Sequence, residues 1–161
     1  MDDAQRIFLR DRFAQAVVRQ PGLAILRARL LEIGGEELVA RDEPDLKSIL
    51  SQGKHMDEPV VLTPMLDSAC HENVSALWAK GALAGIATGY ALSEDGLWRQ
   101  HSWGVSDAGI VETTEVRECY FGATLSMPQA DVFATSNLHG KARVIWSLRR
   151  IFRLLTSRRR R

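Results

Sequence analysis

Apolar residues recur at helical spacing through the first third of the chain. One stripe runs over residues 7–18, a second over 23–33, and a shorter third over 46–50. A glycine follows each stripe, and glycine commonly marks the end of a helix. The pattern predicts three helices, which make up a helical N-terminal part over residues 1–55.

A central helix is predicted over residues 67–81. Asp67 and Ser68 are residue types that cap a helix start, and Gly81 suits a helix end. One face of this segment carries a stripe made of Cys70, Val74, Leu77, Trp78 and Gly81. We therefore expect the helix to bury this stripe, with Cys70 on its first turn.

The following residues change to strand-like patterning. Apolar runs typical of strands occupy residues 60–62, 86–92, 97–105, 110–116 and 119–125. Glycine-containing turns at 94–96 and 106–109 separate three of them, and such short turns favour antiparallel hairpins. The residues after Pro128 are typical of a loop as far as Gly140.

A final amphipathic helix is predicted over residues 142–155, with arginines on its polar face. The elements together predict an α+β fold: a helical N-terminal segment, a central helix packed on an antiparallel sheet, and a basic amphipathic C-terminal helix. We expect residues 1–140 to form one domain with a core over 60–125, followed by a basic helix and Arg-rich tail over 141–161.

The charge of the chain is divided between these two parts. The 161 residues include 21 Lys and Arg and 20 Asp and Glu, which gives a formal net charge of +1. Residues 141–161 hold nine of the basic residues and none of the acidic ones, so they carry +9 against −8 for the rest. A basic C-terminal segment of this kind most commonly forms a helix that packs on its own domain. The alternatives are contact with an anionic membrane, nucleic acid or an acidic protein.

The cysteine count and the N-terminal sequence indicate a reducing compartment. Cys70 and Cys119 are the two cysteines, too few for a disulfide framework. The charged N-terminus lacks the apolar stretch of a signal peptide, and no window approaches the length of a membrane span. We expect a cytoplasmic protein, with the basic end allowing a peripheral position at a membrane surface.

Three residues together suit a cysteine hydrolase: Cys70, His101 and Glu112. A helix N-terminus and a nearby imidazolium both lower the pKa of a thiol, so Cys70 is the candidate nucleophile. His101 would form that imidazolium and protonate the leaving group, and Glu112 would orient the imidazole. If the turn between their strands is centred on residues 107–108, the numbers of paired residues sum to 215 and Glu112 lies diagonally across from His101.

The same elements resemble a known class of enzymes. Cysteine on a helix in SACHENVSALW, then His101-Ser102-Trp103 on a strand and Glu112-Thr113-Thr114 on the next, is similar to the transglutaminase-like core of the papain-like superfamily, which includes the NlpC/P60 peptidases. Glu112 stands where the family usually has aspartate. The resemblance covers about residues 60–125 and implies a papain-like α+β fold with a Cys-His-acid site, for which no cofactor is expected.

Each candidate residue also has a structural alternative. Cys70 on an apolar face is more often a core residue, and His101 alone would be a structural histidine. The alternative to catalysis is a metal site, with ligands from Cys70, His71, His101 and Glu112 and from His55 or His139. The sequence has no Cys-x-x-Cys or His-x-x-x-His pair to support such a site.

The sequence therefore predicts a hydrolase or acyl transferase that acts on an amide, peptide or thioester bond of a peptide, protein or small amide. Trp103, Asn73 and His71 are the candidate substrate-binding residues beside the triad. The alternative is a non-catalytic papain-like binding module that uses residues 141–161 to contact an anionic or acidic partner.

Overall fold

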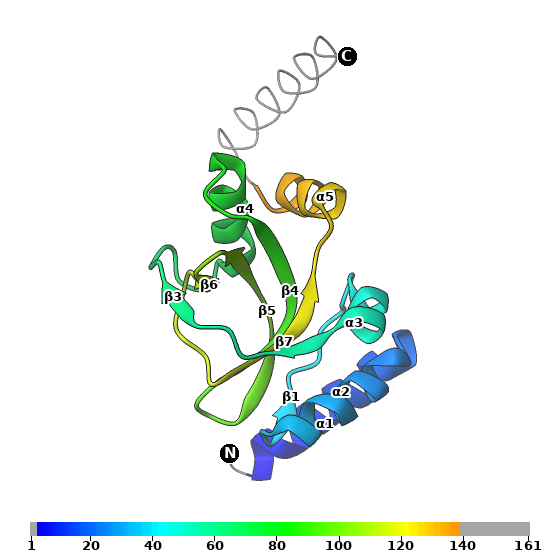
Figure 1. The fold of residues 1–161 in the computed structure, drawn as a ribbon. Helices are drawn as coiled ribbons and strands as arrows, with labels where there is room; N and C mark the ends of the chain where they lie inside the picture. Colours follow the sequence, from blue (N-terminus) through cyan, green and yellow to red (C-terminus); the bar gives the residue numbers. More distant parts are fainter. Residues whose placement is uncertain (1–2, 139–161) are drawn as a thin grey trace.

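The computed structural model of the protein describes residues 3–138. Within them the fold is α+β, as predicted, with five helices and a curled mixed sheet (Figure 1). The helices are α1 (Asp3–Arg19), α2 (Gly22–Ile33), α3 (Leu46–Gln52), α4 (Cys70–Lys80) and α5 (Met127–Asn137). The strands are β1 (Glu37–Leu38), β2 (Lys54–Met56), β3 (Val60–Leu62), β4 (Gly85–Leu92), β5 (Leu97–Ser106), β6 (Gly109–Glu112) and β7 (Cys119–Thr124).

The strands of the described residues form one seven-stranded sheet in the order β2-β7-β4-β5-β6-β3, with β1 paired to β5. The strands from β2 to β6 in this order pair antiparallel, whereas β3 runs parallel to β6 and β1 parallel to β5. The expectation of a purely antiparallel sheet is therefore wrong at these two pairings. The parallel β3 matters for the site, because the chain leaves it directly towards α4.

The register predicted between β5 and β6 is confirmed. Gly104 pairs with Val111 and Val105 with Ile110, so paired residue numbers sum to 215. The strand predicted over 110–116 ends early, at Glu112. The Glu112 side chain explains this end, because its Oε1 accepts the backbone N–H groups of Thr113 and Thr114 and so bends the chain away from the ladder.

Helix α5 replaces the loop that we predicted after Pro128. The N–H and hydroxyl of Ser126 both donate to Gln129 Oε1, at 3.0 and 2.6 Å, which fixes the first turn. Proline is well tolerated in that turn, since its missing N–H would have no partner there. The helix buries only small residues, Ala130 and Ala134, on the molecule's interior side. The predicted helix over 142–155 lies outside the described residues.

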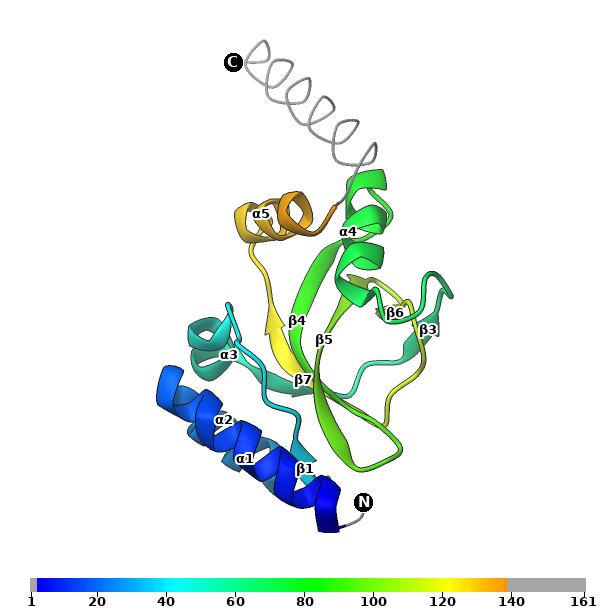
Figure 2. The same cartoon turned by 180° about the vertical axis from the view of Figure 1, so that it is seen from behind.

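Helices gather at two ends of the sheet. Figure 1 and the reverse view in Figure 2 place α1 and α2 at one end and α4 and α5 at the other. The N-terminal helices share a core with the sheet, in which Leu23 and Leu26 pack with Trp98. The indole of Trp98 also donates to Gly34 O at 2.8 Å, which ties α2 to β5. At the other end of the sheet, α4 packs against β5.

Among the residues described, none of the helices combines the length and apolar character needed to cross a membrane.

Candidate active site

The segment between β3 and α4 places Cys70 beside the sheet. Its backbone follows β6, with Thr63 N–H bonded to Glu112 O at 2.7 Å and Met65 N–H to Thr113 O at 2.9 Å. Ser68 then adopts a φ of 58°, a left-handed conformation that residues other than glycine rarely take. This turn lets α4 begin at Cys70, close to the carboxyl-terminal end of β6.

Capping of α4 differs from the expectation. The N-cap position is Ala69, and no side chain caps it, so neither Asp67 nor Ser68 has the predicted role. The first N–H groups of a helix have no intrahelical partner and carry partial positive charge. Cys70 therefore lies where an anion is stabilised, on the first residue of the helix.

His101 and Glu112 form a buried pair beneath the cleft. His101 Nε2 lies 2.8 Å from Glu112 Oε2, and the two residues are 4% and 0% exposed. The same carboxylate accepts hydrogen bonds from Tyr120 Oη at 3.0 Å and from the N–H and hydroxyl of Thr114, each at 2.9 Å. Burial alone would raise the pKa of Glu112, but the interactions with His101 and, to a smaller extent, with Thr114 lower it to about 2.

The Cys70 thiol and the His101 imidazole have strongly shifted pKa values. Burial raises the pKa of the thiol, but interactions with His101 and His71 outweigh burial and bring it to about 5. Burial lowers the pKa of His101, but interactions with Cys70 and Glu112 raise it to about 9. At neutral pH the geometry therefore favours a thiolate and an imidazolium.

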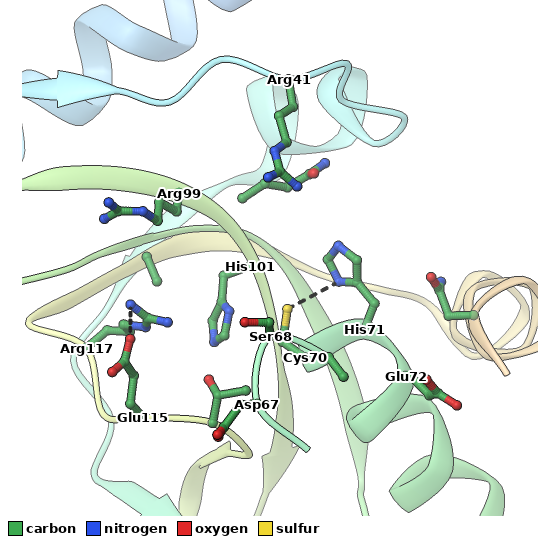
Figure 3. Close-up of a pocket in the computed structure, with 15 residues that line it drawn as sticks. Arg41, Asp67, Ser68, Cys70, His71, Glu72, Arg99, His101, Glu115 and Arg117 are labelled. Atoms are coloured by element: carbon green, nitrogen blue, oxygen red, sulfur yellow. Dashed lines mark hydrogen bonds and ion pairs between the residues drawn. The ribbon is translucent and has the colours of Figure 1, made fainter. Parts of the chain in front are cut away.

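His71 lies on the other side of the sulfur from His101, as Figure 3 shows. Its Nδ1 is 3.8 Å from Cys70 Sγ and 2.5 Å from the hydroxyl of Ser102, which is buried in β5. The ring also packs edge-on against Phe133 of α5, with centroids 5.5 Å apart. The residue predicted to bind substrate is therefore part of the immediate surroundings of the thiol.

Trp103 and Asn73, the other two candidates for substrate contact, are buried and do not line the cleft. Trp103 is 0% exposed and stacks behind His101, with ring centroids 6.2 Å apart and planes at 23°. Asn73 is 1% exposed and donates to Leu66 O at 2.7 Å, which holds the segment before Cys70. From these positions, Trp103 and Asn73 support the site and do not line it.

A glycine makes room for this support. A Cβ on Gly122 would lie 2.8 Å from Trp103 Cη2 and 2.4 Å from Thr88 O. Contacts under 3.0 Å are too short for a real Cβ atom, so only glycine at this position of β7 allows the indole to lie where it supports His101.

The thiol opens into a cleft of about 570 Å³. Its polar lining includes three arginines, Arg41, Arg99 and Arg117, and three acids, Asp67, Glu72 and Glu115. Arg99 is bonded to Asp95, and Arg117 to Glu115 (Figure 3), whereas Arg41 forms no ion pair with a described residue. The cleft thus presents both charges to a ligand, with one arginine available for pairing.

Sequence reasoning missed two residues that support the site, Tyr120 and Ser102. Tyr120 donates to Glu112, and Ser102 fixes the ring of His71. Ser102 lies next to His101 in sequence, but its partner could be known only from the packing of α4 on β5. For Tyr120 the signal was weak, because a tyrosine in a strand is ordinarily a packing residue.

The metal site weighed from the sequence and the second cysteine can both be compared with this geometry. Within residues 3–138, His, Cys, Asp and Glu side chains do not form a group of three or more suited to a metal ion. His139 lies outside the described residues. The second thiol, Cys119, has its pKa raised to about 11 by burial and by the nearby Asp57 carboxylate, so at neutral pH it remains protonated.

No protein-family model matches the chain, and searches of curated proteins and of solved structures found no match. The function is therefore argued from the chemistry of the site.

Proposed function

We propose that the protein is a cysteine hydrolase or acyl transferase that acts on an amide, peptide or thioester bond, built on a core related to the transglutaminase-like members of the papain-like superfamily. One observation carries the proposal. The Cys70 thiol, at the start of α4, faces His101, whose Nε2 is bonded to the buried Glu112 carboxylate at 2.8 Å. Nucleophile, base and orienting acid thus stand in the order that covalent catalysis requires.

In the first half of the reaction, the Cys70 thiolate attacks the carbonyl carbon of the substrate. The carbonyl π electrons move to oxygen and give a tetrahedral oxyanion. Because the free N–H of Cys70 lies at the helix start, it is placed to donate to that oxygen. When the tetrahedral species collapses, the bond to the leaving group breaks and the His101 imidazolium donates its proton to the departing atom. An acyl thioester on Cys70 remains.

In the second half, neutral His101 takes a proton from water or from an acceptor amine as that molecule attacks the thioester carbonyl. A second oxyanion forms and collapses, the carbon–sulfur bond breaks, and Cys70 leaves as a thiolate. The His101 imidazolium is restored in the same cycle. Glu112 stays ionised throughout and keeps Nε2 of His101 protonated, so that Nδ1 faces the sulfur.

His71 is the candidate side-chain donor for the oxyanion. Its Nδ1 is occupied by the Ser102 hydroxyl, which leaves Nε2 as the ring nitrogen for the cleft. With a proton on each ring nitrogen, His71 can face the sulfur through Nδ1–H and donate from Nε2 to the oxyanion, where it would supplement the Cys70 N–H. This assignment gives the site a second donor, which the sequence alone did not identify.

The accessible thiol also weighs against the non-catalytic alternative. A binding module has no need for a reactive cysteine, and we would expect Cys70 to be sealed under other side chains. Cys70 instead lines the cleft and is only partly buried. Residues 141–161, on which the binding module depends, lie outside the described residues.

An acyl-enzyme trap tests the proposal. The protein is mixed with p-nitrophenyl acetate or S-phenyl thioacetate, and the acetylated residue is located by mass spectrometry. We expect a burst of product equal to the enzyme concentration and acetylation of Cys70, both lost in Cys70→Ala and retained in Cys119→Ala. Hydroxylamine added as acceptor separates transfer from hydrolysis. Acetylation of Cys70 no faster than that of Cys119, or turnover retained in Cys70→Ala, would overturn the proposal.

A further inference from the structure

A second cavity, of about 430 Å³, adjoins the cleft at the thiol. It lies between α5 and the segment 43–45, with side chains of β4 and β5 between them. His71, Gln100 and Asn137 line both this cavity and the cleft that contains Cys70. The two spaces therefore meet at His71, whose Nδ1 is 3.8 Å from the sulfur.

The second cavity differs from the cleft in its chemistry. Leu125, Pro128, Val132 and Phe133, from α5 and the residues before it, give the cavity an apolar wall, beside which lie the polar side chains of Gln129, Ser136 and Asn137. Val132 is 62% exposed although it is a large apolar side chain. An apolar concave surface beside convergent polar groups is typical of a ligand site, because a bound apolar group removes such surface from water.

Charge at the opposite wall restricts the occupant further. Glu43 is 1% exposed and accepts hydrogen bonds from Gln100 Nε2 at 2.8 Å and from Asp45 N–H at 3.0 Å. Glu43 and Asp45 both line the cavity, whereas the arginines of the site line the cleft. An anionic substituent would meet two carboxyl groups without a cation, and the apolar side chains of the facing wall favour a neutral apolar group.

We propose that this cavity binds a neutral apolar substituent attached to the reacting carbonyl, such as an aliphatic chain or an apolar amino-acid side chain. The inference rests on the proposed function and specifies its substrate class. A substrate carbonyl at Cys70 would direct one substituent past His71 into the cavity, while the rest of the substrate occupies the polar cleft. Phe133, edge-on to His71, forms the wall at the entrance.

Alkylation kinetics test this proposal. The full chain is treated with iodoacetamide or with N-hexyl iodoacetamide at pH 6, and each second-order rate constant for Cys70 is divided by that for glutathione. We expect the normalised constant to be about tenfold larger for the hexyl reagent, since each buried methylene contributes roughly 0.8 kcal/mol and only part of the chain is covered. Val132→Asp should abolish most of this preference, and the matched change Val18→Asp on α1, at a residue 83% exposed, should retain it.

Two outcomes separate this inference from the proposed function. If Cys70 reacts rapidly with iodoacetamide but shows no preference for the hexyl reagent, or if Val132→Asp retains the preference, the proposed apolar site is contradicted. The proposal that Cys70 is the nucleophile is unaffected by that result. If Cys70 reacts slowly with both reagents, the proposed function fails. The cavity is then tested by measuring, with NMR, the binding of the unreactive N-hexylacetamide. Val132→Asp should weaken this binding at least severalfold, and Val18→Asp should not. Absence of binding overturns the inference.

Discussion

Replacing Glu112 with glutamine removes the charge that orients His101 and changes little in size. The carboxylate accepts from His101 and Tyr120 on Oε2 and from Thr113 and Thr114 on Oε1. A glutamine has only one acceptor oxygen, so its NH₂ group must face donors on one of the two sides. The variant therefore loses the ion pair and gains an unsatisfied buried contact.

The structure gives the size of this effect. Lowering the Glu112 pKa from an ordinary 4.5 to about 2 corresponds to about 3 kcal/mol in favour of the ionised carboxylate in the folded protein. Because the folded pKa is lower than the unfolded one, this stability is fully present above about pH 4.5 and is lost as the pH falls through about 2. We expect Glu112→Gln to lower the free energy of unfolding by about 3 kcal/mol at pH 7, and this difference to fall to about half by pH 3.

Urea unfolding followed by tryptophan fluorescence at pH 7 and pH 3 measures both values. Glu115→Gln is the matched control, because the Glu115 side chain is 69% exposed in its ion pair with Arg117. Such exposed pairs contribute about 0–1 kcal/mol, so the control should stay close to the wild type. Equal stability of the two variants at pH 7, or a Glu112→Gln deficit that does not shrink at pH 3, would refute the reasoning.

Three further outcomes follow from the site. The pH profile of kcat/KM should be bell-shaped, with limbs near pH 5 and pH 9, because the thiolate takes up a proton below the first and the imidazolium loses its proton above the second; a single limb near pH 8.5 would contradict it. His71→Ala should lower kcat about 10²-fold with little change in KM, with partial rescue by His71→Gln, which keeps an N–H donor; an equal loss in both variants would argue against a donor role. Gly122→Ala should lower the melting temperature by several degrees and shift Trp103 fluorescence, whereas Gly85→Ala, where a Cβ meets nothing closer than 3.5 Å, should be tolerated; equal effects would exclude the close contact as the cause.

Local chemistry made part of the fold predictable. The β5–β6 register follows from one turn, in which Gly109 has a φ of +114° and is the residue type suited to that conformation. Glycine likewise marked the ends of α2 and α3, at Gly34 and Gly53, whereas Gly22 begins α2 instead of ending α1. The order of Cys70, His101 and Glu112 along a helix and two paired strands was the basis for expecting them to meet, since β5 and β6 are neighbours in sequence and only β4 separates α4 from β5.

The remaining features depend on contacts that a local pattern does not contain. Strands β1 and β2 have two and three residues, too few for an alternating pattern to emerge. The parallel pairing of β3 with β6 joins residues about 50 positions apart. The segment that leaves β3 then leads to Cys70. The position of His71 beside the sulfur depends in turn on where α4 lies against β5.

Titration of the Cys70 thiol tests the central claim most directly. The ultraviolet absorbance of the thiolate is followed against pH in Cys119→Ser, with the double variant that also carries Cys70→Ala as baseline. We predict a midpoint near pH 5, and a shift towards the ordinary cysteine value of about 8.5 when His101→Ala is added. A midpoint near 8.5 in the protein that retains His101 and Glu112 would contradict the account, because the thiolate–imidazolium pair would then be absent at neutral pH.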